Sequence, residues 1–570
     1  MASTPLSPPQ NRWPASRCLA TLPNELLQRV FLECRNHRLD KNYMKPAKWR
    51  RSIATPNPYG DVCVYTLSEL SKTCSRFRAI AQPILHSYFF PTYSGMSNHG
   101  NIAQLFLFTR TCAHQRELRE SVRFLRIGGQ ITLRGGDLGM PFGSIRYLSM
   151  AERYILEQVA KSLGFPGNTL PHSWYNGDDY MHDQSSLLAD GTYYTWNDHA
   201  EWSMFVGALA LALTIPNLET LDITGLPRPD FIIDNAIQTV LVGKVPPVLM
   251  KLRALRIRCM FSAMDMEQML NNLLAWAPDL SRVELHRSFS FNGRTSTPAE
   301  FARARKVTHL ELHEPNPTFT AASFRNVVRM FKGLETLVYR GNTNYSFVGQ
   351  SGNPALFEPM PKDMADMLRP LAPTLKTFVY TTLPSNFAGV IGSLDKMVRL
   401  EELFISTNTL WGNHWAHPPP ALTELSKFLP KSIRTFFVIE TKINDPYIAV
   451  FEEFVTGLEN KRFEHLNPDP PQHGISGIDG QQQNPDGQNP GGQNPAQPVV
   501  KPKYDYPDIK HLGIVLDKSI PPQVVDALCR GGQGLPPDHP TIAVNHKKYM
   551  DLNNLTARYG RLGIKFDVLR

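Results

Sequence analysis

A six-residue phrase, apolar-x-x-apolar-x-apolar, recurs along most of this 570-residue chain. One copy reads Leu218 to Ile223 (LETLDI) and another reads Leu334 to Tyr339 (LETLVY). Eleven copies are recognisable, and they begin at Val122, Ile145, Leu218, Leu252, Leu280, Val307, Leu334, Leu375, Leu400, Ile433 and Ile509. A repeat of this kind constrains the fold strongly, because each unit must adopt the same local structure.

The end of each phrase alternates apolar and other residues with a period of two, which predicts a short strand. The segments between phrases carry apolar residues at helical spacing instead, as in 266–274, 324–331 and 448–458. One strand and one helix cannot bury their own apolar faces, so the units must stack with parallel strands side by side. We therefore predict an α/β solenoid with strands on the concave face and helices on the convex face.

The phrase resembles that of the leucine-rich repeat family. It lacks the Asn or Cys that the family usually places directly after the phrase, and the spacing of the copies is irregular. The resemblance implies the same solenoid architecture.

Composition indicates a globular chain, because 42% of the residues are hydrophobic. The net charge of +9 is small for this length and favours a solvated basic surface over a nucleic-acid groove. The seven cysteines include no Cys-x-x-Cys pair, residues 1–20 lack the apolar core that a signal peptide needs, and no apolar run reaches membrane-spanning length. We expect a cytoplasmic or nuclear protein that neither binds a membrane nor needs a cofactor.

Two helical patterns stand near the N-terminus, LPNELLQRVF at 22–31 and LSELSKTCSRFRAIAQPIL at 67–85. Together they resemble the F-box, the helical module of substrate receptors in SCF ubiquitin ligases, although about 30 residues separate the two halves. The resemblance implies that one set of apolar residues forms both the module's core and its contact with the adaptor: Leu22, Pro23, Leu26, Leu27, Val30, Phe31, Leu67, Leu70 and Phe77. The alternative is a plain helical cap on the open end of the solenoid.

An F-box followed by irregular leucine-rich repeats resembles receptors that are abundant in filamentous fungi. It implies a non-catalytic subunit that binds the S-phase kinase-associated protein as adaptor, through it a cullin, and a protein substrate. The chain has no Gly-rich phosphate loop, Gly-x-Ser-x-Gly elbow or paired-His metal motif, which agrees with a receptor that is not an enzyme. The alternative is a leucine-rich-repeat scaffold or interaction module with no role in ubiquitin transfer.

The predicted organisation is a disordered N-terminus (1–17), the F-box-like module (18–90, with an inserted loop at 35–65) and the solenoid (91–570). The solenoid contains two interruptions. Residues 164–202 are rich in Asp, His and aromatic residues, but none has metal-ligand spacing, so we interpret the segment as a surface loop without a metal. Residues 467–503 are rich in Pro, Gly and Gln, which predicts a disordered loop.

The fifth residue of each phrase should face the concave side, opposite to the fourth and sixth. From the copy at Leu218 onward these residues are first charged (Asp222, Arg256, Glu284, Glu311) and then apolar (Val338, Val379, Phe404, Phe437). Exposed apolar surface tends to mark a binding site. We therefore predict that substrate docks on the four apolar residues, with Trp411 and Trp415 beside them, unless neighbouring loops cover this face.

Overall fold

The computed structural model shows two compact units, Met1–Pro359 and Met360–Arg570. Their boundary falls inside the predicted solenoid, where the repeated phrase predicts no division. The structure describes residues 19–33, 58–89, 107–127, 212–226, 249–259, 264–291, 302–313, 319–341, 361–381, 391–410, 428–440, 451–459, 509–516 and 554–569, with gaps at 113, 213, 287–288, 407–408 and 453. The segments 1–17, 164–202 and 467–503 and the phrase at Ile145 lie outside these residues.

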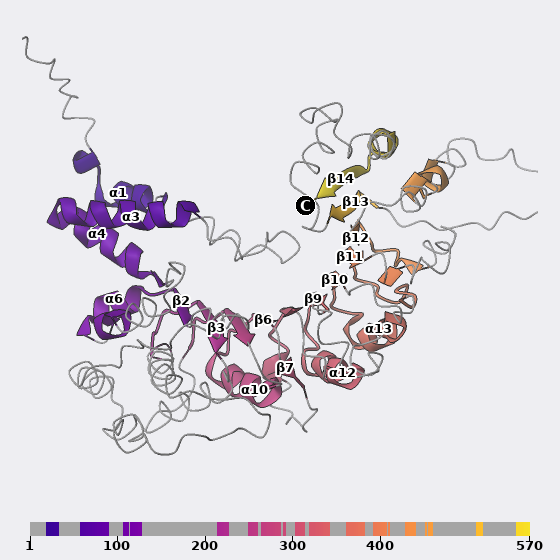
Figure 1. Ribbon diagram of the computed structural model, residues 1–570, viewed down its shortest axis with the longest axis horizontal. Coiled ribbons are helices and arrows are strands. Elements are labelled where there is room, and N and C mark those ends of the chain that lie inside the picture. The colour runs from indigo at the N-terminus through magenta and orange to yellow at the C-terminus, as the bar shows by residue number, and fades with distance from the viewer. Residues whose placement is uncertain are drawn as a thin grey trace, which may run out of the picture. The chain divides into compact units, whose positions relative to one another are not determined.

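The described part of the first unit begins with a helical module that includes a short 3-10 turn, η2 (Leu19–Thr21), and the helices α1 (Asn24–Glu33), α3 (Pro58–Thr73) and α4 (Ser75–His86). Helix α3 starts at Pro58, so the last part of the predicted 35–65 loop is helical. The helices share a small core of buried apolar side chains, in which the rings of Phe31 and Phe77 meet edge to face at 5.3 Å. Figure 1 shows these helices packed side by side.

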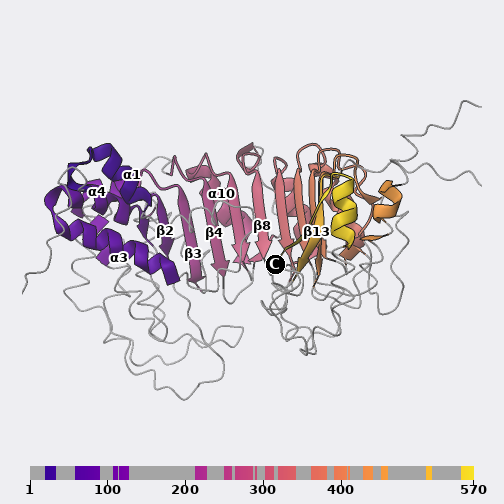
Figure 2. The ribbon, with the colours of Figure 1, turned by 90° about the horizontal axis from the view of Figure 1, so that it is seen from above.

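The sheet of the first unit is built from the predicted phrases. Its strands are β1 (Tyr88–Phe89), β2 (Phe124–Ile127), β3 (Thr220–Leu226), β4 (Ala254–Cys259), β6 (Arg282–His286), β8 (His309–His313) and β9 (Thr336–Arg340), in this spatial order. All pair in parallel, and each strand from β2 onward begins at the third residue of its phrase. Figure 2 shows β2, β3, β4 and β8 running in the same direction.

Helices α6 (Arg116–Ser121), α10 (Met266–Trp276) and α12 (Ala321–Met330) lie between strands of the first unit in sequence. The short strands β5 (Met264–Asp265) and β7 (Phe289–Ser290) form a separate parallel pair. Helices α10 and α12 lie on one side of the sheet (Figure 1). Thr320 caps α12, because its hydroxyl accepts a hydrogen bond from the amide of Ser323.

The sixth residue of the phrase packs toward this helix side. The ring of Tyr339, in β9, meets Phe324 of α12 edge to face at 5.7 Å, and both side chains are fully buried. Successive residues of a strand point to opposite faces, so the fifth residue, Val338, lies on the other face of the sheet. This arrangement confirms the predicted alternation of the phrase.

The second unit begins with helix α13 (Pro361–Leu368) and the 3-10 turn η7 (Arg369–Leu371), and its strands are β10 (Thr377–Thr381), β11 (Glu402–Ser406), β12 (Thr435–Glu440), β13 (His511–Leu516) and β14 (Lys565–Leu569). They pair in parallel and in sequence order. Strand β13, from the phrase at Ile509, pairs directly with β12. The repeat pattern therefore continues after the 467–503 tract.

Within the part of the chain that the structure describes, seven strands form the main parallel sheet of the first unit and five form that of the second. Ten of them come from the eleven phrases, and β14 corresponds to the predicted alternation at the C-terminus. Strand β1 precedes residue 91, where we placed the start of the solenoid, so the sheet begins within the predicted module. The architecture is an α/β solenoid of the leucine-rich-repeat type. Among the described residues no helix has the length and apolarity to cross a membrane.

Candidate functional site

The apolar residues that the sequence predicted for the core and adaptor contact of the helical module fall into a buried and an exposed group. Leu27, Phe31, Leu67 and Phe77 are buried in its core, and Leu22 and Leu70 pack partly against them. Pro23, Leu26 and Val30 are exposed instead, with 43% of Leu26 and 37% of Val30 accessible to water. Leu26 and Val30 are four residues apart on α1, so they form one apolar stripe on its outer side.

Hydrogen bonds from Arg76 connect the start of α1 to α4. The Arg76 guanidinium donates from Nε to Asn24 Oδ1 at 2.8 Å and from Nη2 to the Leu22 carbonyl oxygen. Cys74 caps α4, because its sulfur accepts a hydrogen bond from the Phe77 amide. These contacts fix the orientation of the exposed stripe relative to the rest of the module.

The same module also leads directly into the sheet. The Ser87 carbonyl, at the end of α4, accepts hydrogen bonds from the amides of Arg123 and Phe124 at 2.9 and 3.0 Å. The rings of Tyr88 and Phe124 stack at 5.6 Å across β1 and β2. The helices therefore stand at the first edge of the sheet, where a solenoid needs a cap.

A row of buried charged side chains crosses the sheet of the first unit on the face opposite the helices. The backbone register places Arg126, Asp222, Arg256, Glu284 and Glu311 at equivalent positions of consecutive strands β2, β3, β4, β6 and β8. All five are buried. We call these five residues the charged ladder.

Opposite charges alternate along most of the charged ladder. Arg126 Nε donates to Asp222 Oδ2 at 3.1 Å, and Arg256 Nη1 lies 3.5 Å from the same oxygen. Arg256 Nη2 donates to Glu284 Oε2 at 2.7 Å. Glu311 receives its hydrogen bond from Nη2 of Arg282, which comes from the start of β6. Each acid is therefore paired with at least one guanidinium, as buried charges require.

These contacts keep the acids ionised. Burial alone would raise the pKa of Glu284, but the charge of Arg256 and the hydrogen bond from His286 outweigh it and hold that pKa well below its usual range. Burial and the nearby Glu284 would also raise the pKa of Glu311, yet the hydrogen bond to His313 and the charge of Arg282 bring it below the usual value. The two glutamates of the charged ladder are thus held in their ionised form.

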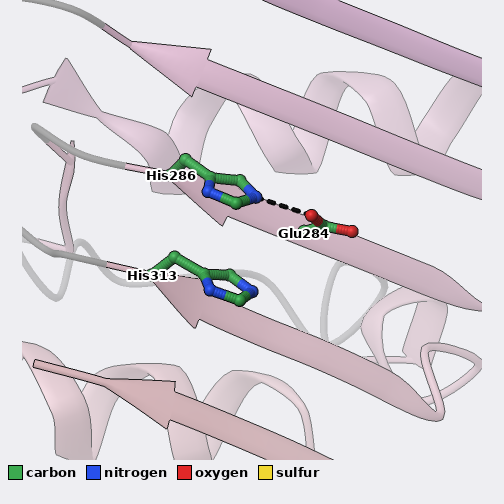
Figure 3. A group of neighbouring side chains, drawn as sticks. All are labelled: Glu284, His286 and His313. Carbon is green, nitrogen blue, oxygen red and sulfur yellow. Dashed lines mark hydrogen bonds and ion pairs between the residues drawn. The ribbon is translucent and has the colours of Figure 1, made fainter. Parts of the chain in front are cut away.

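Two histidines stand at the end of the same strands, two residues beyond the acids. His286 Nε2 lies 2.6 Å from Glu284 Oε1, and His313 Nε2 lies 3.1 Å from Glu311 Oε2. The two imidazoles are stacked, with ring centroids 4.2 Å apart. Figure 3 shows both rings pointing the same way along the sheet, with Glu284 at the nitrogen end of His286.

Arginines flank the histidine pair in the same register, Arg258 on β4 and Arg340 on β9. Among the described residues, the buried Nε and Nη2 of Arg258 have no hydrogen-bond partner. Burial lowers the pKa of Arg258, and Asp222 partly opposes that effect.

Sequence reasoning predicted the acids of the charged ladder but missed the two histidines. The signal was present, since the tripeptide Glu-Leu-His recurs at 284–286 and 311–313, at the same position of two consecutive phrases. A paired-His motif requires two histidines close in sequence, so it does not detect this repeated tripeptide, whose two copies are 27 residues apart. The fold brings them together through strand pairing.

The apolar residues do not form the open docking surface that we predicted. In the first unit Val338 is 1% exposed, and in the second unit Val379, Phe404 and Phe437 are 1%, 2% and 0% exposed. The period-two pattern correctly identifies the face but not whether that face is covered, and parallel sheets are usually covered on both faces. Trp411 and Trp415 lie outside the described residues.

Comparison with known proteins identifies no family for this chain. No family model matches this chain, and no curated protein does. Among solved structures, it is similar to the leucine-rich repeat-containing protein LegL7 from Legionella pneumophila, with 12% sequence identity and a TM-score of 0.24 over 46% of this chain and 88% of the other. The likeness is weak, and the leucine-rich-repeat character of the fold rests on the repeated phrase and on its parallel strands.

Proposed function

We propose that this protein is a non-catalytic substrate receptor of an SCF-type ubiquitin ligase. Its helical module would bind the adaptor, the S-phase kinase-associated protein, and through it a cullin, while the repeats hold a protein substrate. The observation that carries the proposal is the exposed apolar stripe of Leu26 and Val30 on a module whose core is closed without them. Both belong to the set that the F-box resemblance assigns to the module and its adaptor contact.

The stripe is suited to such a contact for a physical reason. Leu27 and Phe31 already fill the core of the module, so the apolar character of Leu26 and Val30 does not contribute to folding. Apolar side chains that are exposed at helical spacing are the usual anchors of helix-mediated interfaces.

Co-expression with the adaptor tests this proposal. We expect the wild-type protein to co-purify with the adaptor and the Leu26→Asp, Val30→Asp variant to lose it while keeping its circular dichroism spectrum. Gln28 and Arg29 are exposed on the same helix, so a Gln28→Asp, Arg29→Asp variant is the matched control and should retain the adaptor. Failure of the wild-type protein to hold the adaptor would reject the proposal.

The direct junction between the module and the sheet favours a second candidate, a leucine-rich-repeat scaffold whose helices only cap the array. The hydrogen bonds from Arg123 and Phe124 to Ser87 are its main support. In that case the Leu26→Asp, Val30→Asp variant would behave like wild type toward every partner. Removal of residues 1–90 would expose the edge of the sheet and lead to aggregation.

A further inference from the structure

We propose that Glu284, His286 and His313 form a binding site for a divalent transition-metal ion of the zinc class. The side chains offer one carboxylate oxygen and two imidazole nitrogens, and these three atoms all lie within 4.8 Å of one another. Two ligands of one tetrahedral zinc ion are about 3.4 Å apart, given metal–ligand distances of about 2.0–2.2 Å. Small side-chain rotations are therefore enough to bring the three atoms onto one ion.

The scaffold under these residues is rigid. Glu284 and His286 stand on β6, and His313 stands on β8 at the position paired with His286. Neighbouring parallel strands are about 4.8 Å apart, and this spacing places the two imidazoles side by side (Figure 3). Sites on strands hold their geometry better than sites on loops.

The surrounding hydrogen bonds orient the ligands. Arg256 holds Oε2 of Glu284 and leaves Oε1 facing His286, 2.6 Å from its Nε2. Arg282 holds Oε1 of Glu311 and leaves Oε2 facing His313. Outer partners of this kind fix ligand orientation in metal sites. When the ion binds, Glu311 is placed either to become a fourth ligand or to accept a hydrogen bond from a bound water.

The donor set and the local charge select the type of ion. Imidazole nitrogens favour Zn²⁺, Co²⁺, Ni²⁺ and Cu²⁺, whereas Ca²⁺ and Mg²⁺ require oxygen donors. The positive charges of Arg256 and Arg282 balance the negative charges of Glu284 and Glu311, so the site lacks the excess of acid that calcium sites use. Arg258 stands next to His286 in register. Its buried Nε and Nη2 have no hydrogen-bond partner within the part of the chain that the structure describes, and they can donate to an anion or hydroxide on the metal.

The test is a titration of the metal-stripped full-length chain with Zn²⁺ in competition with a chromogenic chelator. We expect one equivalent to bind, and affinity to fall at least tenfold in His286→Phe and in His313→Phe, which keep an aromatic ring but lack the ligand nitrogen. His309→Phe is the control, because His309 lies on β8 like His313 but outside the cluster. This variant should bind Zn²⁺ like wild type. No bound equivalent, or binding that neither ligand substitution weakens, overturns the proposal.

A second measurement uses no variant, so it tests the metal site even if a substitution unfolds the chain. X-ray absorption at the zinc edge of the loaded wild-type protein should show nitrogen and oxygen ligands that include two imidazoles. A sulfur-containing shell would place the ion on cysteines and overturn the proposal. The test is independent of the adaptor experiment, since the exposed stripe of α1 is no part of this cluster.

Discussion

The imidazole rings of His286 and His313 lie nearly parallel, at 5°, with their centroids 4.2 Å apart. They stack because strand register places them at equivalent positions of β6 and β8. Burial, and the charge that the neighbouring ring would carry, hold the pKa of His286 at about 3, although the hydrogen bond to Glu284 opposes the shift. His286 is thus neutral in the folded protein near pH 7.

This low pKa predicts a loss of stability in mild acid. An unfolded histidine has a pKa of about 6.5, so between about pH 6.5 and pH 3 the unfolded chain binds one more proton at residue 286 than the folded chain. His286 should therefore contribute a decrease of up to about 2 kcal/mol in the free energy of unfolding from pH 7 to pH 5. Urea titrations of the metal-free protein at pH 7 and pH 5 measure this decrease in the free energy of unfolding.

The matched variant for this measurement is His286→Phe, which should lose less stability over the same range. Glu284 titrates in a lower window, because its folded pKa is depressed and its contribution is lost only as the pH falls through that value. Work above pH 5 therefore isolates the histidine. Equal losses in wild type and variant would contradict the assignment.

The charged ladder predicts a large effect from a single buried arginine. Arg256→Met strips both Asp222 and Glu284 of a guanidinium, and an uncompensated buried charge costs about 3–5 kcal/mol. The double variant Arg256→Met, Glu284→Met should be less destabilised than the single one. Lys72→Met breaks an exposed pair with Glu69 and should cost no more than about 1 kcal/mol. Urea denaturation measures the free energy of unfolding of all three variants. An Arg256→Met variant as stable as wild type would refute the structural role of the charged ladder.

The strands and the side on which the helices pack could be predicted from the sequence, because both follow from local periodicity. Leu337 and Tyr339 were correctly assigned to the helix side from their position in the phrase alone. Coverage of the opposite face could not be predicted, since it depends on what packs over Phe404 or Val338 rather than on the phrase. The pairing of His286 with His313 depends on register, which becomes visible only when consecutive phrases are aligned.

In the helical module the sequence could not divide the predicted apolar residues into core and surface. Leu26 and Leu27 are adjacent and equally apolar, yet one is exposed and the other fully buried. The direction in which α1 packs on α4 decides between them, and the Arg76–Asn24 hydrogen bond that helps to set this direction joins residues 52 positions apart. No local pattern specifies such a contact.

Two glycines should respond in opposite ways to the same substitution. A Cβ added at Gly333 would lie 2.0 Å from the carbonyl oxygen of Arg305, a backbone atom that cannot move without displacing the neighbouring repeat. Gly333→Ala should destabilise by about 1–3 kcal/mol. Gly560, near the end of a helix, has nothing within 4 Å of such a Cβ, and Gly560→Ala should stabilise by up to about 1 kcal/mol.

The midpoint of thermal unfolding, followed by circular dichroism, should shift by about 2–4 °C per kcal/mol for the second unit and by less for the larger first unit. The midpoint should fall for Gly333→Ala and rise slightly for Gly560→Ala. A Gly333→Ala variant as stable as wild type would mean that the turns of the two repeats are not in contact.

The rings of Phe404 and Phe437 stack across β11 and β12 with their centroids 5.2 Å apart, and His511 meets Phe437 edge to face at 4.7 Å. Because these rings are buried, Phe437→Ala should cost about 3–5 kcal/mol, like other large core truncations. In a double-mutant cycle with Phe404→Ala, the coupling energy should be about 0.5–1.5 kcal/mol. Val398→Ala, at a residue 67% exposed in the same unit, is the control and should stay within about 0.5 kcal/mol of wild type.

The same burial predicts how charge will act at this face. A carboxylate cannot be desolvated there without a partner, so Phe404→Asp or Phe437→Asp should unfold the second unit rather than merely prevent a partner from docking. Limited proteolysis should therefore cut within strands β10 to β12 rapidly in these variants and slowly in wild type. If Phe437→Asp resists protease and keeps the unfolding midpoint of wild type, the face is open to water, and these aromatic residues would again be candidates for the surface that binds a protein substrate.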